Sequence, residues 1–189
     1  RKFKTAPGTA YVKGFAYYIA CINIEAVYDD LVKENQYQSF GSMVFTDTFQ
    51  LYEQEKDMIA NLLPDNSERR TKQKKRDITV VIGNPPYSAK QSSANDNAAN
   101  LSYPNLDQRI EKTFAASSRV QNINALYDSY IRALRWASDR IGDEGIVGFV
   151  TGSGWINKSF GRGIRKCFAD DFSEIYIFDL KGDVRKDIF

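Results

Sequence analysis

The stretch that decides the fold is Ile78-Thr79-Val80-Val81-Ile82-Gly83-Asn84-Pro85-Pro86-Tyr87. Its first half is almost entirely apolar and β-branched, which is typical of a short strand buried on both faces, as in a parallel sheet. A glycine and two prolines follow and end the strand, because proline has no backbone N–H to donate to a neighbouring strand. The stretch therefore predicts a buried strand with a rigid polar turn at its carboxyl end.

Outward from this strand, apolar periodicity predicts alternating helices and strands. The predicted helices span 16–31, 53–63, 126–141 and 158–169, and the other predicted strands span 43–46, 146–150 and 174–178. Pro64-Asp65-Asn66 is interpreted as the stop of the second helix, and Gly142 as the stop of the third. The alternation predicts an α/β fold, with a mainly parallel sheet and helices on both faces.

Ligands of such folds bind beyond the carboxyl ends of the strands. Three segments qualify by position: the turn after Phe45, the turn after Ile82, and Thr151-Gly152-Ser153-Gly154-Trp155. The polar stretch from about Ala89 to Asn105 has few apolar anchors and is expected to be a mobile functional loop.

The composition limits the chemistry. The sequence has no histidine, which excludes Ser-His-Asp hydrolysis, Cys-His proteolysis and His-based metal sites, and no metal site is expected. Cys21 and Cys167 lie among apolar neighbours and are expected to be free, buried thiols in a reducing cytoplasm. No apolar run is long enough to span a bilayer, so no membrane partner is expected. A basic run, Arg69 to Arg76, is interpreted as a solvated helix face, with a phosphate-facing patch as the alternative.

Asn84-Pro85-Pro86-Tyr87 has groups that suit a flat ring with an exocyclic amine. The two prolines hold the Pro85 carbonyl rigidly beside the Asn84 amide oxygen, which gives two acceptors at one point. Tyr87 adds a π-face for stacking. Two acceptors can orient both N–H bonds of an amine and direct its lone pair at an electrophile by positioning and electrostatics alone. The alternative is a Pro-Pro turn in which Tyr87 only packs.

This segment resembles motif IV of amino-methyltransferases, in the form typical of γ-type DNA adenine-N6 enzymes. The resemblance extends to further stretches, and over residues 16–186 it is to the methyltransferase domain of single-polypeptide restriction–modification enzymes of the type ISP class. These stretches are Val80–Tyr87, Ser92–Asn97, Tyr103–Ile110, Leu126–Ala133 and Trp136–Trp155. The resemblance implies a Rossmann-like methyltransferase fold, S-adenosylmethionine as cofactor, and a cytoplasmic enzyme that acts on double-stranded DNA with a flipped adenine.

The resemblance also implies roles for individual residues. Asn84 and Pro85, with Pro86 fixing the turn, would hold the target amine, and Tyr87 would stack on the extruded base. Asp47 falls where such enzymes place an acid that accepts a hydrogen bond from the cofactor's adenine amine, and Phe49 would line that pocket. The alternatives are a capping or turn role for Asp47 and a core role for Phe49.

The sequence also departs from the family pattern. No glycine-rich cofactor loop precedes Asp47, and Arg1 to Gly14 contains no acidic residue. We therefore expect residues 1–189 to form a partial catalytic domain, incomplete at both ends, with restriction, helicase and target-recognition modules as partners. Two alternatives remain: an inactive fragment without turnover, or an amino-methyltransferase that acts on a protein glutamine or an rRNA guanine.

Overall fold

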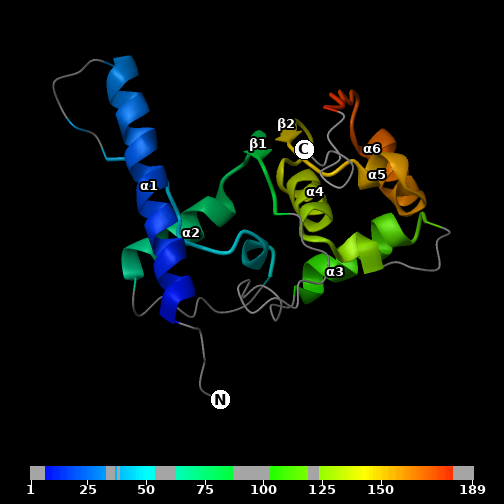
Figure 1. Ribbon diagram of the computed structural model, residues 1–189, viewed down its shortest axis with the longest axis horizontal. Helices are drawn as coiled ribbons and strands as arrows, with labels where there is room; N and C mark the ends of the chain where they lie inside the picture. The colour runs from blue at the N-terminus through cyan, green and yellow to red at the C-terminus, as the bar shows by residue number, and fades with distance from the viewer. Residues whose placement is uncertain are drawn as a thin grey trace, which may run out of the picture. The chain divides into compact units, whose positions relative to one another are not determined.

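The computed structural model describes residues 7–32, 37, 39–53, 63–86, 103–118 and 124–180 (Figure 1). The chain divides into two compact units. One comprises 1–78 and 90–104, and the other comprises 79–89 and 105–189. The stretch that predicted the fold, from Thr79 onward, lies in the second unit.

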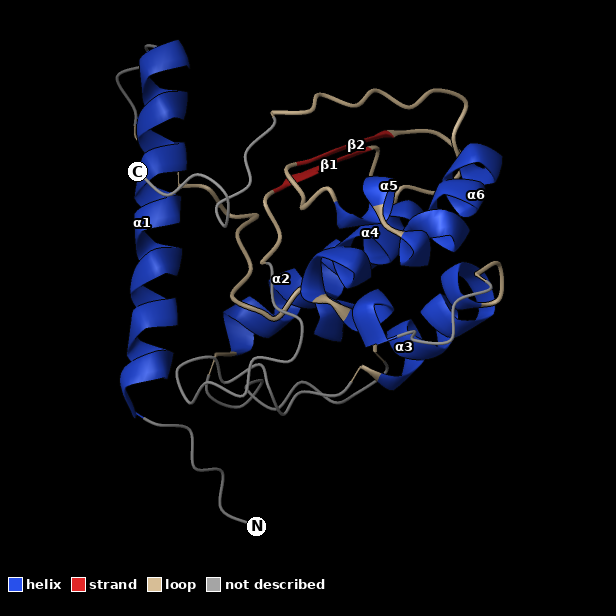
Figure 2. Ribbon diagram, turned by 45° about the vertical axis from the view of Figure 1, so that its right-hand side comes forward, coloured by secondary structure: helices blue, strands red, loops and turns tan. Residues whose placement is uncertain are grey.

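The second unit contains a parallel sheet of two strands, β1 (Val80–Gly83) and β2 (Ile146–Phe149). Val80 pairs with Ile146 and Gly83 pairs with Phe149. The ladder continues past the strand ends, where the Val150 N–H donates to the Gly83 carbonyl at 3.1 Å. Figure 2 shows the two strands side by side, with the helices that follow β2 on one side of them. The two predicted strands are confirmed, and they run parallel, as the predicted sheet requires.

Helices supply the core of this unit. They are α3 (Pro104–Ile110), which continues into a π-helical turn η3 (Glu111–Ala115), η4 (Asn124–Tyr127), α4 (Ser129–Arg140), α5 (Gly154–Asn157), η5 (Ser159–Gly161) and α6 (Arg162–Asp171). Aromatic rings join them: Phe168 contacts Phe114, Trp155 and Phe172 edge-on, with centroids 5.4–5.8 Å apart. Such pairs add to the stabilisation from burying apolar area.

Helix α4 was predicted correctly from the spacing of its apolar residues. Its apolar residues recur at helical spacing and are buried, including Ile131, Leu134 and Ala137. Asp128 caps its amino end, where Oδ1 accepts from the Tyr130 N–H at 3.4 Å. Gly142, with φ of +66°, follows its carboxyl end in the left-handed conformation that glycine adopts without strain. The expected stop at Gly142 is confirmed.

The first unit contains α1 (Pro7–Val32), η1 (Phe49–Leu51) and α2 (Pro64–Lys75). Glu25 on α1 accepts from the Tyr37 hydroxyl and the Phe40 N–H, both at 2.8 Å. Tyr17 of α1 packs edge-on against Phe45, with ring centroids 5.7 Å apart. These contacts tie α1 to the segment that leads to Asp47.

Several expectations differ from the structure. Residues 43–46 and 174–178 belong to no strand, and a complete Rossmann sheet with helices on both faces is not present among the described residues. Pro64, Asp65 and Asn66 are themselves helical, since Pro64 begins α2, where a proline at the first helical position lacks only an N–H that would have no partner. Residues 54–62 of the predicted second helix lie outside the described residues. Cys21 and Cys167 are free thiols but only half-buried.

Candidate active site

Asn84, Pro85 and Pro86 leave the carboxyl end of β1, as the sequence predicts for a ligand-binding turn. Asn84 and Pro86 are exposed, whereas Pro85 between them is buried. The buried proline anchors the turn, while the Asn84 side chain remains accessible to a ligand. Tyr87 and Ser88 lie outside the described residues, as do residues 89–102 of the expected mobile loop.

The segment after β2 lies beside this turn, because the strands are parallel and their carboxyl ends meet at one edge. Trp155 is buried and donates from Nε1 to the Thr151 hydroxyl at 3.1 Å. Arg165 Nη1 donates to the carbonyls of Trp155 and Ile156, at 2.7 and 2.8 Å. Arg165 therefore holds the 151–157 segment from α6, a role that the sequence did not predict.

Asp47 and Phe49 form a second group, in the first unit. Asp47 Oδ1 accepts from the Phe49 N–H at 3.0 Å, which closes a turn at the start of η1. Asp47 Oδ2 accepts from the Tyr103 hydroxyl at 2.7 Å. The Tyr103 ring packs edge-on against Phe49, with centroids 5.2 Å apart. The structure therefore brings these two predicted residues together and adds Tyr103, which sequence reasoning did not identify.

Asn66 is a further residue that sequence reasoning missed. It is 4% exposed and makes two hydrogen bonds to the backbone of Phe45. Its Oδ1 accepts from the Phe45 N–H at 2.7 Å, and its Nδ2 donates to the Phe45 carbonyl at 2.9 Å. Asn66 thus satisfies both backbone groups of a segment that belongs to no strand. It holds the chain two residues before Asp47.

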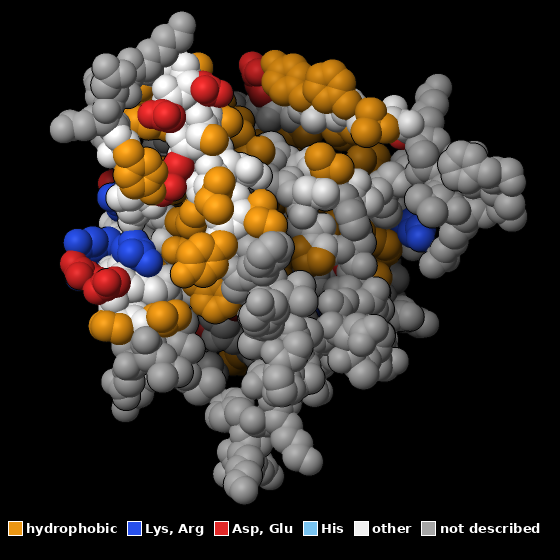
Figure 3. Space-filling view, turned by 60° about the vertical axis from the view of Figure 1, so that its left-hand side comes forward, with side chains coloured by type: hydrophobic (Ala, Val, Ile, Leu, Met, Phe, Trp, Pro, Cys, Tyr) orange, Lys and Arg blue, Asp and Glu red, His pale blue; other side chains and the backbone are white. Residues whose placement is uncertain are grey.

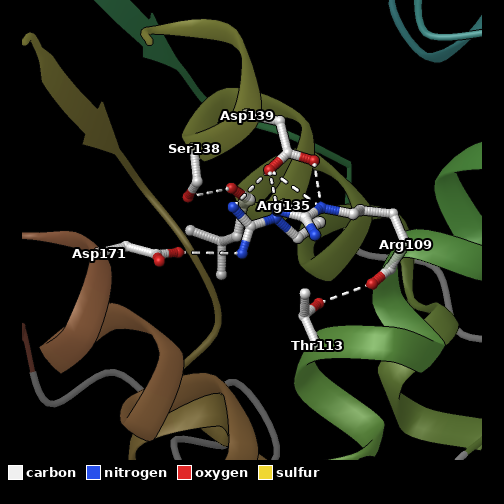
Figure 4. A network of polar contacts seen from close by, with 7 residues as sticks. Arg109, Thr113, Arg135, Ser138, Asp139 and Asp171 are labelled. Carbon is white, nitrogen blue, oxygen red and sulfur yellow. Dashed lines mark hydrogen bonds and ion pairs between the residues drawn. The ribbon is translucent and has the colours of Figure 1, made fainter. Parts of the chain in front are cut away.

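An ion-pair network joins α3, α4 and α6 in the second unit (Figure 4). Arg135, whose side chain is 3% exposed, pairs with Asp139 at 2.6 Å and with Asp171 at 3.1 Å. Arg109 also contacts Asp139, at 3.1 Å. The network borders a cleft of about 640 Å³ that includes Gly145, just before β2. Because it adjoins the amino end of β2, this cleft is at the sheet edge opposite Asn84.

Two further features concern the part of the chain that the structure describes. No group of three or more Asp, Glu or Cys side chains there could hold a metal ion. None of the helices described is both long enough and apolar enough to cross a membrane.

Comparison with known proteins identifies the family. The family model described as Eco57I restriction-modification methylase matches residues 11–189. No curated protein matches the chain.

Among solved structures, a nuclease-deletion mutant of the type ISP restriction-modification enzyme LlaGI, in complex with a DNA substrate mimic, is 40% identical over 84% of this chain, with a TM-score of 0.77. The ATP-dependent type ISP enzyme LlaBIII, bound to DNA, is 42% identical over 80% of this chain, with a TM-score of 0.73. A DrdV–DNA complex is 41% identical over 82%, with a TM-score of 0.72.

This chain spans 13%, 10% and 15% of the LlaGI, LlaBIII and DrdV chains, respectively. The family match covers the turn at Asn84 as well as Asp47 and its neighbours. The chain therefore belongs to the Eco57I restriction-modification methylase family, and its fold matches the methylase region of type ISP restriction-modification enzymes.

Proposed function

We propose that this chain contains the target-amine site of a DNA adenine-N6 methyltransferase of a restriction–modification system, with S-adenosylmethionine as methyl donor. The observation that carries the proposal is the turn after β1, where exposed Asn84 and buried Pro85 leave the carboxyl end of a parallel strand. Membership of a restriction–modification methylase family supports DNA as the substrate.

The chemistry follows from two acceptors and a rigid backbone. The Asn84 amide oxygen and the Pro85 carbonyl would each accept a hydrogen bond from one N–H group of the target amine. The lone pair of the amine would then point away from both oxygens. As the nitrogen bonds to the methyl carbon and the bond from that carbon to the donor's sulfur breaks, the nitrogen would gain positive charge, which the two oxygens would stabilise before a proton leaves. Neither oxygen has to reorganise during the step, because Pro85 and Pro86 fix the turn. Tyr87 would stack on the base.

The group around Asp47 fits the adenine end of the cofactor. Asp47 is an acceptor that suits an exocyclic amine, and Phe49 and Tyr103 provide aromatic rings beside it. When bound, S-adenosylmethionine would supply an electrophilic methyl group on a positively charged sulfur. The role of Asp47 would be to select the amino-bearing purine and that of Phe49 to exclude water from one side of it.

The test is methyl transfer by the full-length protein that contains these residues. Radiolabelled S-adenosylmethionine is offered with duplex DNA, RNA or a protein substrate, and the product is identified by mass spectrometry. We expect N6-methyladenine in DNA. Asn84→Ala should lower turnover by about 10²–10³, the loss typical of removing a preorganised hydrogen-bonding group.

The control is Gln108→Ala, which removes an exposed side-chain amide from α3 in the same unit and should leave turnover within about twofold. Methylation of RNA or protein in place of DNA would support the alternative amino-methyltransferases. Full turnover by Asn84→Ala would contradict the proposed site, and no transfer to any substrate by the unaltered full-length protein would support the alternative of an inactive remnant.

A further inference from the structure

The carboxylate of Asp47 is held from both sides. Oδ1 accepts the Phe49 N–H and Oδ2 accepts the Tyr103 hydroxyl, so that each oxygen already has one donor. The two donors are also linked to each other, because the Phe49 and Tyr103 rings pack edge-on. Tyr103 is only 4% exposed, so its hydroxyl has little alternative contact with water. The result is a closed arrangement of three residues around one carboxylate.

This arrangement leaves capacity for a ligand. An ionised carboxylate has about four acceptor positions on its two oxygens. The Phe49 N–H and the Tyr103 hydroxyl each take one of these positions, so Asp47 can accept an amine while both contacts are kept. Hydrogen bonds to an ionised acceptor are stronger than neutral ones, which makes the Tyr103 contact an effective restraint on the side chain.

We propose that Tyr103 is a positioning residue that sets the selectivity of the Asp47 site for a purine with a 6-amino group. The inference rests on the proposed cofactor role of Asp47 and adds a residue 56 positions away in the chain. Tyr103 holds Oδ2 through its hydroxyl and holds Phe49, hence the turn that fixes Oδ1, through its ring. A carboxylate with a restricted rotamer loses less entropy when an amine binds to it.

The experiment compares two ligands in the full-length protein. One is S-adenosylhomocysteine, and the other is its analogue with hydrogen in place of the 6-amino group. The ratio of their dissociation constants, measured by calorimetry, reports recognition of the amine without catalysis. Tyr103→Phe keeps the ring and removes the hydroxyl, and we expect the ratio to fall roughly tenfold, as for loss of a hydrogen bond to a charged group.

Tyr37→Phe is the matched control. It removes the same kind of contact, a tyrosine hydroxyl that donates to a carboxylate at 2.8 Å, from a different place in the same unit. We expect it to leave the ratio unchanged. A second measurement needs no ligand: amide hydrogen exchange at Phe49 should be faster in Tyr103→Phe and unaltered in Tyr37→Phe, because Asp47 is restrained from only one side once the Tyr103 hydroxyl is removed.

The outcomes separate this inference from the proposed function. Asp47→Ala should abolish the discrimination between the two ligands, and Tyr103→Phe should then have no further effect on it. If Asp47→Ala keeps the discrimination, or the unaltered protein has none, the cofactor role of Asp47 is wrong and the inference falls with it. If Asp47→Ala abolishes the discrimination between the two ligands, but Tyr103→Phe keeps or increases the ratio of their dissociation constants, the cofactor role of Asp47 stands. The positioning role of Tyr103 is then overturned.

Discussion

Pro85 shows how a single buried residue prepares an exposed one. In the turn after β1, it is the only described residue that is buried, while Asn84 before it and Pro86 after it are exposed. The centre of this turn packs inward, and the prolines restrict its φ angles. The Asn84 amide therefore has little conformational entropy to lose when a ligand binds. The rigid turn at the end of the strand could be predicted from the sequence alone, because the prolines themselves restrict the backbone.

Tyr87 follows this turn, and its proposed role depends on the aromatic ring and not on the hydroxyl. If it stacks on the extruded base, Tyr87→Ala should lose roughly 1–3 kcal/mol of stacking and lower methylation accordingly, whereas Tyr87→Phe should keep most activity. Steady-state methylation of a duplex by each variant measures the difference. Equal damage from both substitutions would mean that the hydroxyl matters and that stacking is the wrong role.

The roles of Tyr103 and Asn66 could not be predicted from the sequence. Both contact residues far away in the sequence, Tyr103 with Asp47 and Asn66 with Phe45. Nothing in the local pattern distinguishes a tyrosine before a proline, or an asparagine shortly after one, from an ordinary turn residue. Their roles depend on tertiary contacts, which periodicity and spacing do not report.

At the scale of elements, the predictions that succeeded were those with a regular apolar pattern and a partner to pack or pair with. Helix α4 was found because its apolar side chains recur with the period of a helix, and the strands β1 and β2 because short continuous apolar runs are typical of buried strands. The segments 43–46 and 174–178 are also apolar but belong to no strand. In the first, the side chain of Asn66 bonds to the backbone of Phe45, and in the second Tyr176 and Phe178 are 77% and 87% exposed.

The contact between α6 and η3 gives a test at this scale. A Cβ added at Gly163 would overlap the carbonyl oxygen of Phe114, a backbone atom that cannot rotate away. Gly163→Ala should therefore destabilise the protein by about 1–3 kcal/mol, despite the higher helix propensity of alanine. Urea unfolding measures the change.

Gly41→Ala is the control, because nothing lies within 4 Å of a Cβ at that position. It should change stability by less than about 1 kcal/mol. A Gly163→Ala variant as stable as the parent would mean that α6 and η3 do not approach as closely as the structure has them.

At the scale of the whole molecule, apolar patterning and burial do not coincide everywhere. Val80, Ile82 and Ile146 share one face of the sheet and are 52%, 81% and 67% exposed, although the sequence predicted a strand buried on both faces. Helix α1 likewise has exposed apolar side chains, such as Ile22 and Leu31, and Figure 3 shows hydrophobic side chains at the surface of the face turned to the viewer. A sheet of two strands buries less than the larger sheet that the pattern predicted.

The basic run is the charge feature that could extend the DNA contact. The interpretation as an exposed helix face is confirmed for Lys72, Lys74 and Lys75, which lie on α2, whereas Arg69 and Arg70 of the same run are half-buried. Two of these ammonium groups have protein partners. Lys72 pairs with Glu68 at 2.6 Å, and Lys74 donates to the Glu53 carbonyl at 3.0 Å. Burial lowers the pKa of Lys74 from its ordinary value, a further sign that this side chain contacts protein.

We expect replacement of Lys72, Lys74 and Lys75 by glutamine to change DNA affinity less than about threefold. In the chain, α2 leads to the amino end of β1, while Asn84 leaves its carboxyl end. The four residues of β1 extend over about 13 Å, which exceeds the Debye length of about 8 Å at physiological salt. Phosphates that flank the target base should therefore hardly respond to these charges.

Salt dependence gives the sharper measurement of this prediction. Removing one cationic side chain that binds a phosphate lowers the slope of log affinity against log salt by roughly one. The triple variant of the full-length protein should keep the slope of the parent, measured by titration of a labelled duplex at several salt concentrations. A slope lower by about two or more would make α2 part of the DNA footprint. The DNA path would then include α2 as well as the carboxyl edge of the sheet, because a lower slope means that these side chains bind phosphates.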